Sequence, residues 1–183
     1  LYHRRAWRDP AGHDIDRQLS VVAPLGIEPP APAVPRLGVG EEARGAIQAL
    51  LAGDGLAVGE DYVVLAPGSA WISKQWMPER YGEVARALLA AGERLVYVGA
   101  PSEAETVRAV RRLAGGGIDL AGRTDTAGLA AVIAGASAVV CNDSAPMHIA
   151  QAFGVPLVVV VGPTSAAQGF MPRFEPREVL TAA

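Results

Sequence analysis

Cysteine is nearly absent from the sequence, with Cys141 as its single occurrence in 183 residues. One cysteine closes no disulfide framework and makes no CxxC pair, so a disulfide-rich secreted fold is excluded. Cys141 falls in an apolar run, where cysteine usually acts as a small hydrophobic residue, and we expect a reducing compartment. The histidines show no metal-ligand spacing, so we expect no bound metal.

Long hydrophobic runs and an excess of basic charge are missing too. The run 156–161 is far too short to span a bilayer, and Gly154 and Gly162 flank it, so we expect no transmembrane segment. The net charge of −3 leaves no general basic face, which argues against nucleic acid as a partner. Because the chain begins at Leu1 without a recognisable signal peptide, we expect it to be part of a longer protein.

Three motifs of nucleotide-dependent and hydrolytic enzymes are absent. Without GxxxxGK[ST], ATP hydrolysis is not supported. Without GxGxxG, nicotinamide-dependent hydride transfer is a weak alternative. Without GxSxG, a hydrolase nucleophile elbow is not indicated.

Aromatic residues make up only 5% of the chain against 50% hydrophobic residues, so the core must be built from Ala, Val and Leu. Short apolar runs alternate with helical patterns, which is typical of a doubly wound parallel sheet in an α/β fold. The pattern predicts strands at residues 62–66, 94–98, 118–120, 138–141 and 157–161, and a weaker one at 179–180. It predicts helices at residues 41–51, 78–91, 102–114 and 127–136 and after Ser144, with Ser102 and the 124–126 turn as caps.

Residues 1–35 are predicted to be a connector, and residues 36–183 a single sheet domain. In the connector, Ile15, Leu19 and Val22 fall at helical spacing, which predicts one short helix that ends at Gly26. Four prolines between residues 29 and 35 then predict a stiff, extended linker.

Polar clusters follow two of the predicted strands, at residues 67–76 and 142–144. The carboxyl ends of parallel strands share one edge of the sheet, where such folds bind ligands. Asp143 or Ser144 can cap the next helix, and its N-terminal amides would suit a phosphate. Lys74, the only lysine, is as compatible with a diphosphate site as with a solvated loop. The residues alone therefore predict a domain that binds a phosphorylated ligand.

Two further side chains have an ordinary and a functional interpretation. Glu103, early in the helix after a strand, could accept hydrogen bonds from a ribose diol, although a surface carboxylate beside the helix dipole is commoner. His148 lies one turn into the helix after Asp143, and a lone histidine is more often structural than catalytic.

Three runs carry a family resemblance: PGSAWISKQWMPERYGEVARALLAAG, VYVGAPSEAE and IDLAGRTDTAGLAAVIAGASAVVCNDSAPMHIAQAFGVPLVVVVGPT. Together they resemble glycosyltransferase family nine, which contains the ADP-heptose:lipopolysaccharide heptosyltransferases. The resemblance covers roughly residues 62–164 and implies the C-terminal half of a GT-B fold, a Rossmann-like domain that binds the nucleotide-sugar donor. The resemblance implies that the acceptor-binding N-terminal domain and its catalytic aspartate lie outside this sequence, so no catalytic residue is expected in this chain.

The resemblance also implies roles for single residues. Ser69 and Lys74 would meet the donor phosphates, Glu103 the ribose and Thr124 the adenine. The remaining donor-binding residues would lie around the diphosphate and the transferred sugar; they are Asp143, Ser144, the amide of Ala145, and His148. Ala145 stands where the family usually has glycine, and Ala70 where some members carry a second hydroxyl.

The implied activity is inverting transfer of heptose from ADP-heptose to the lipopolysaccharide inner core, without a metal or other cofactor. The implied location is the cytoplasm or the inner face of the inner membrane. Two alternatives stay open: a nucleotide-binding module without transferase activity, and another GT-B enzyme such as a nucleotide-sugar 2-epimerase.

Overall fold

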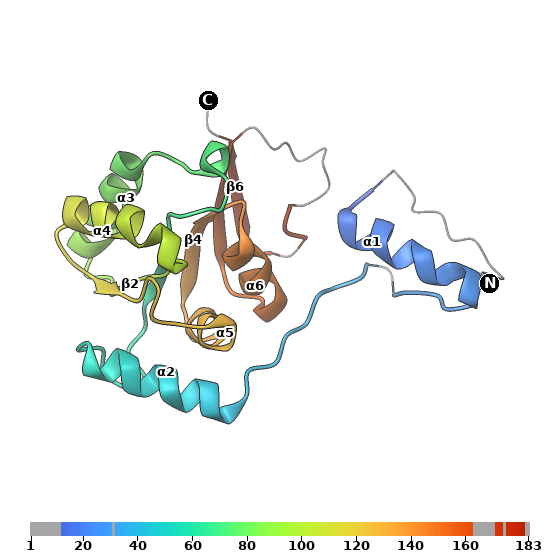
Figure 1. Cartoon of the computed structure of the whole chain (residues 1–183), viewed down its shortest axis with the longest axis horizontal. Helices are drawn as coiled ribbons and strands as arrows, with labels where there is room; N and C mark the ends of the chain where they lie inside the picture. Colours follow the sequence, from blue (N-terminus) through green and yellow to red (C-terminus); the bar gives the residue numbers. More distant parts are fainter. Residues whose placement is uncertain (1–11, 31, 163–170, 174, 182–183) are drawn as a thin grey trace.

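A computed structural model describes residues 12–30, 32–162, 171–173 and 175–181. Within these residues one sheet of parallel strands forms the centre of the fold (Figure 1). Its strands are β1 (Val63–Ala66), β2 (Leu95–Tyr97), β3 (Ile118–Asp119), β4 (Ala138–Asn142), β5 (Leu157–Val161) and β6 (Arg177–Thr181). They lie in the order β3-β2-β1-β4-β5-β6, which is the order of a Rossmann-like sheet.

Helices cover both faces of the sheet because successive side chains of each buried strand point to opposite sides. On one face, Val63 and Leu65 pack with α3 (Pro78–Ala90) and α4 (Ala104–Ala114). On the other face, Val64 and Ala66 pack with three helices. These are α2 (Glu41–Gly53), α5 (Thr126–Ala134) and α6 (Ala145–Phe153). The predicted α/β fold with a doubly wound parallel sheet is confirmed.

The strand order turns back between β1 and β4, and this switch point positions the site. β1 pairs with β2 on one side and with β4 on the other. The chain that leaves β1 crosses to one face, and the chain that leaves β4 crosses to the other, so their loops diverge and open a crevice at this edge. The two polar clusters predicted to share this edge follow β1 and β4.

Most predicted elements are found, with small shifts at their ends. The strand at 157–161 coincides with β5, and the weak signal at 179–180 is extended into β6. Cys141 is fully buried in β4, as predicted, and burial raises the pKa of its thiol. Asp125 caps α5 by accepting a 2.7 Å hydrogen bond from Gly128 N–H, which confirms the cap within 124–126.

The predicted cap at Ser102 is wrong. Ser102 lies inside a 3-10 turn, η3 (Pro101–Glu103), and α4 begins after it. The Glu103 carboxylate accepts a hydrogen bond from the Ala100 N–H at 2.7 Å. The backbone amide at the start of this turn is therefore satisfied by a glutamate three residues later in the chain, not by Ser102.

The connector contains α1 (Asp14–Leu19), which continues as a 3-10 helix, η1 (Ser20–Leu25). Gly26 ends it at φ +77°, a left-handed conformation that favours glycine, as the sequence predicts. These two helices bury no residue, and an extended segment leads from them to α2 (Figure 1). Arg173 binds Asp16, and this hydrogen bond lowers the pKa of the Asp16 carboxyl. The predicted connector's first eleven residues lie outside the described part, and its boundary at residue 35 stays a prediction.

Candidate nucleotide-binding site

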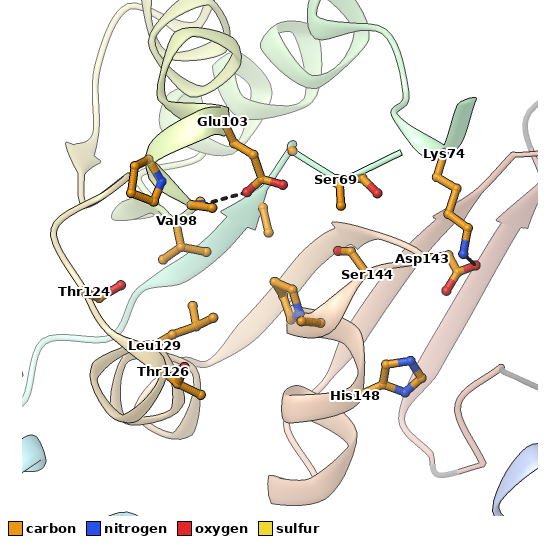
Figure 2. Close-up of a pocket in the computed structure, with 18 of the residues that line it drawn as sticks. Ser69, Lys74, Val98, Glu103, Thr124, Thr126, Leu129, Asp143, Ser144 and His148 are labelled. Carbon is orange, nitrogen blue, oxygen red and sulfur yellow. Dashed lines mark hydrogen bonds and ion pairs between the residues drawn. The ribbon is translucent and has the colours of Figure 1, made fainter. Parts of the chain in front are cut away.

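A cavity of about 600 Å³ opens at the carboxyl ends of β1, β2, β3 and β4 (Figure 2). All eight residues that the sequence singles out line it: Ser69, Lys74, Glu103, Thr124, Asp143, Ser144, Ala145 and His148. They come from the segments that follow four different strands, so the parallel sheet brings together side chains that are far apart in the sequence. The prediction that the polar clusters meet at one edge of the sheet is confirmed.

Lys74 and Asp143 form an ion pair with 2.8 Å between Lys74 Nζ and Asp143 Oδ2. The Asp143 side chain is only 5% exposed, and the Lys74 side chain is 26% exposed. A carboxylate this buried needs an opposite charge to offset its desolvation, so the ammonium is drawn into the cavity. Lys74 is therefore not a solvated loop lysine, which was the ordinary interpretation of its position.

The loop that carries Lys74 is held by bonds within itself. Gln75 Nε2 donates to the Ser69 carbonyl at 2.7 Å, and η2 (Ile72–Lys74) forms one 3-10 turn beside it. Ser69 is buried, and its hydroxyl oxygen accepts from Trp71 N–H at 3.4 Å. Since the oxygen is the accepting atom, the hydroxyl proton can still be donated to a ligand oxygen.

The first turn of α6 offers a backbone donor to the cavity. Ser144 occupies the N-cap position, as predicted, but its side chain makes no capping bond and donates instead to the Asn142 carbonyl at 3.3 Å. Pro146 has no N–H, and Met147 N–H donates to the Ser144 carbonyl at 3.1 Å. This leaves Ala145 as the first-turn amide that suits an anion.

Ala145 adopts this position without strain. No non-glycine residue in the described ranges has a positive φ, so the turn does not require glycine on conformational grounds. The side chain of Ala145 is exposed. A methyl group there adds bulk at the mouth of the cavity and leaves the backbone path unchanged.

Two glycines that the sequence analysis did not select allow Glu103 to reach its place. A Cβ added at Gly68 would lie 2.5 Å from the Glu103 Cδ, and one at Gly99 would lie 3.2 Å from Glu103 Oε2. Both glycines lie two residues after the end of a strand and line the cavity. A glycine at a strand end often marks close approach of another group, and that was the available signal.

Figure 2 shows a gradient of chemistry along the cavity. Val98, Thr124, Thr126 and Leu129 gather at one end, which is mostly apolar with two hydroxyl-bearing side chains. Asp125, between the two threonines in the sequence, also lines the cavity. Lys74, Asp143 and His148 lie toward the other end. Glu103 and Ser69 lie between them. The cavity thus combines an apolar end, a central carboxylate and a cationic end.

His148 projects from α6 with an exposed ring. Partial desolvation by the surrounding protein lowers its pKa, and the charge of Asp143 acts in the opposite direction. The neutral imidazole is therefore the favoured form near neutral pH. No group of three metal-ligating side chains occurs in the part of the chain that the structure describes.

Comparison with known proteins assigns this architecture to a family. The sequence model of glycosyltransferase family 9 (heptosyltransferase) matches residues 1–178. The chain belongs to glycosyltransferase family 9. The resemblance seen in the sequence is thereby confirmed and extends well beyond residues 62–164.

The family members that it resembles are heptosyltransferases. Lipopolysaccharide heptosyltransferase 3 of Escherichia coli K12 is 32% identical over 157 residues, which are 83% of this chain and 44% of that protein. Lipopolysaccharide heptosyltransferase 1 of Pseudomonas aeruginosa is 36% identical over 110 residues, 58% of this chain and 30% of that protein. The chain thus spans less than half the length of these curated relatives.

Solved structures of the family share the fold. The glycosyl transferase family 9 protein of Veillonella parvula superposes with a TM-score of 0.87 at 27% identity, covering 98% of this chain and 51% of that chain. The E. coli heptosyltransferase WaaC, solved with ADP, gives 0.71 at 25% identity, covering 100% of this chain and 54% of that chain. A likeness to about half of each solved protein agrees with one Rossmann-like half of a GT-B fold. No helix in the described ranges of this family 9 chain has the length and apolarity to cross a bilayer.

Proposed function

We propose that this family 9 chain is the donor-binding domain of an inverting glycosyltransferase that transfers heptose from ADP-heptose to the lipopolysaccharide inner core. The observation that carries the proposal is the order of chemistry along the cavity. An apolar end suits adenine, the Glu103 carboxylate suits the ribose hydroxyls, and Lys74 with the Ala145 amide suits a diphosphate. The named heptosyltransferase relatives, one of them solved with ADP, support the same ligand class.

The contribution of this chain to the reaction would be binding and electrostatic stabilisation. In inverting transfer an acceptor hydroxyl attacks the anomeric carbon while the bond to the nucleotide diphosphate breaks. Negative charge then grows on the departing diphosphate, and donors already in place stabilise it most effectively in a desolvated site. Lys74 Nζ and the Ala145 N–H would supply those donors, with the Ser69 hydroxyl as a third.

The remaining parts of the reaction would come from outside this chain. We place the acceptor site and the aspartate that removes the hydroxyl proton in an N-terminal domain, across a cleft from the cavity. Residues 1–35 would connect that domain to the donor-binding domain at 36–183. The proposal needs no metal or other cofactor for donor binding and places the protein in the cytoplasm or at the inner face of the inner membrane.

Calorimetric titration of the 183-residue chain with ADP, adenosine and inorganic diphosphate tests the donor site. We expect ADP to bind more tightly than either part, because it spans both ends of the cavity. A chain that binds none of these ligands would contradict the proposal.

A transfer assay with a lipopolysaccharide-core acceptor tests the division of labour. We expect the isolated chain to bind nucleotide without transferring sugar. Transfer by this chain alone would contradict the placement of the base in another domain.

A further inference from the structure

Asn142 is fully buried at the end of β4 and uses both ends of its side-chain amide. Its Nδ2 donates to the carbonyls of Pro67 at 2.8 Å and Gly68 at 3.2 Å. Its Oδ1 accepts from Trp76 N–H and from the Tyr81 hydroxyl, each at 3.1 Å. One side chain thus joins the end of β4 to both ends of the 67–76 loop.

The hydrogen-bond partners of Asn142 determine which way its side-chain amide faces. A backbone N–H can only donate and a carbonyl can only accept, so Oδ1 must face Trp76, and Nδ2 must face Pro67 and Gly68. Aspartate would place an oxygen against two carbonyls, and an apolar residue would leave buried polar groups unpaired, which is costly. Position 142 therefore needs a side chain that donates at one end and accepts at the other.

Tyr81 completes the arrangement from α3. Its side chain is fully buried, and burial raises the pKa of its hydroxyl well above the ordinary value, so the hydroxyl stays a neutral donor. Its ring packs edge to face on Trp76, with 5.3 Å between ring centroids. Trp76 is thus held through its backbone by Asn142 and through its ring by Tyr81.

We propose that Asn142, supported by Tyr81, is a positioning residue that sets the Lys74 ammonium opposite Asp143. Asp143 directly follows Asn142 in the chain, and Lys74 lies two residues before Trp76. The four hydrogen bonds therefore fix the backbone on both sides of the 2.8 Å ion pair. The inference rests on the proposed function for its link to diphosphate binding, but the position of Lys74 can be measured without a ligand.

Lys74 is the only lysine, so a single side-chain amine reports its position. Reductive methylation with ¹³C-formaldehyde gives one lysine signal beside that of the chain terminus. The variant Asp143→Asn removes the ion-pair partner, and its change in the chemical shift of the lysine signal serves as the reference. We expect Tyr81→Phe to change the chemical shift in the same direction, and Asn142→Ala to change it further. Tyr62→Phe is the matched control, because Tyr62 also donates a buried hydroxyl bond, to the Val132 carbonyl at 2.7 Å, outside this cavity.

Ligand titration of the same variants gives the second readout. We expect Tyr81→Phe to weaken ADP binding about threefold to tenfold and Asn142→Ala by about tenfold or more, with adenosine binding changed by less than about twofold. Thermal unfolding midpoints of Tyr81→Phe and Tyr62→Phe show whether a general loss of stability explains the effect.

The two readouts separate the positioning role from the proposed function. If the Lys74 signal and the ADP affinity of Tyr81→Phe equal those of the parent, the positioning role is refuted while nucleotide binding stands. If the signal moves as expected but the parent chain binds no ADP, the positioning role stands and the proposed function fails. Equal changes in Tyr81→Phe and Tyr62→Phe would refute the specific role, whether or not Asn142→Ala folds.

Discussion

Replacement of Lys74 by alanine tests the proposed phosphate end of the cavity most directly. The Lys74 ammonium lies 2.8 Å from Asp143 Oδ2, so a bound diphosphate would share it with that carboxylate. Hydrogen bonds to charged groups contribute about 1.5–3 kcal/mol each. We therefore expect Lys74→Ala to weaken ADP binding by about tenfold to a hundredfold.

The charge of Asp143 contributes to the expected loss of ADP affinity. A carboxylate about 5 Å from a phosphate charge repels it by about 3 kcal/mol at an effective dielectric constant of about 20. Lys74 offsets this repulsion, so its removal loses both a direct contact and the compensation of Asp143. The double variant Lys74→Ala/Asp143→Asn separates the two effects. If Lys74 contacts the phosphate directly, part of the lost affinity persists in the double variant; if it only neutralises Asp143, affinity returns to that of the parent.

Calorimetric titration of ADP into each variant is the assay. Lys74→Arg should recover only part of the affinity, because a planar guanidinium does not replace a compact ammonium at the same point. Arg80→Ala is the control for net charge, since Arg80 forms an exposed pair with Glu83 outside the cavity and its loss changes the charge by the same amount. An ADP affinity of Lys74→Ala equal to that of the parent would refute the phosphate site.

Three further predictions concern the other parts of the cavity. Glu103→Ala should weaken ADP binding and leave inorganic diphosphate binding unchanged in calorimetry; equal weakening of both would mean that Glu103 acts only through the fold. Ala145→Gly should leave ADP affinity unchanged or improve it, because it removes bulk beside the amide donor without changing a strained backbone; a loss of affinity would show that the methyl group helps to form the site. Because partial desolvation lowers the pKa of His148, the unfolded chain binds a proton there first as the pH falls, so stability is lost below the ordinary pKa of about 6.5. Thermal unfolding between pH 7.5 and pH 5 should therefore fall less in His148→Gln than in the parent, and parallel curves would contradict this coupling.

The order of elements was accessible from the sequence because short apolar runs in parallel sheets are buried on both faces. The run at 157–161 is continuous and bounded by Gly154 and Gly162, so its strand could be placed to the residue. The edge of the sheet that carries the site could be predicted in the same way, because the carboxyl ends of all parallel strands lie at one edge. What the runs do not specify is which strands are neighbours.

The pair of Lys74 and Asp143 could not be predicted for that reason. These residues are 69 positions apart, and they meet because β1 and β4 are adjacent, with Ala66 opposite Cys141. The hydrogen bonds of Asn142 depend on the same adjacency and on the path of the 67–76 loop. The local pattern also predicted the wrong helix cap, at Ser102. A serine hydroxyl competes with other nearby acceptors for the free amides at a helix start, and here the Glu103 carboxylate accepts from the Ala100 N–H.

The nearly buried carboxylate of Asp143 beside the proposed phosphate site has a physical explanation. An unpaired Lys74 on a loop would spend much of its time extended into water, and binding would have to restrict its side chain. The ion pair with Asp143 reduces that entropy loss because it already holds the ammonium in the cavity. On the proposed function, the same charge would oppose a bound diphosphate, which would limit affinity and favour release of a nucleotide product. If Asn142 positions Lys74 as we propose, it keeps the two groups at this distance. The contact between the β1 loop and the end of β4 would then set the balance between holding Lys74 in the cavity and repelling a phosphate.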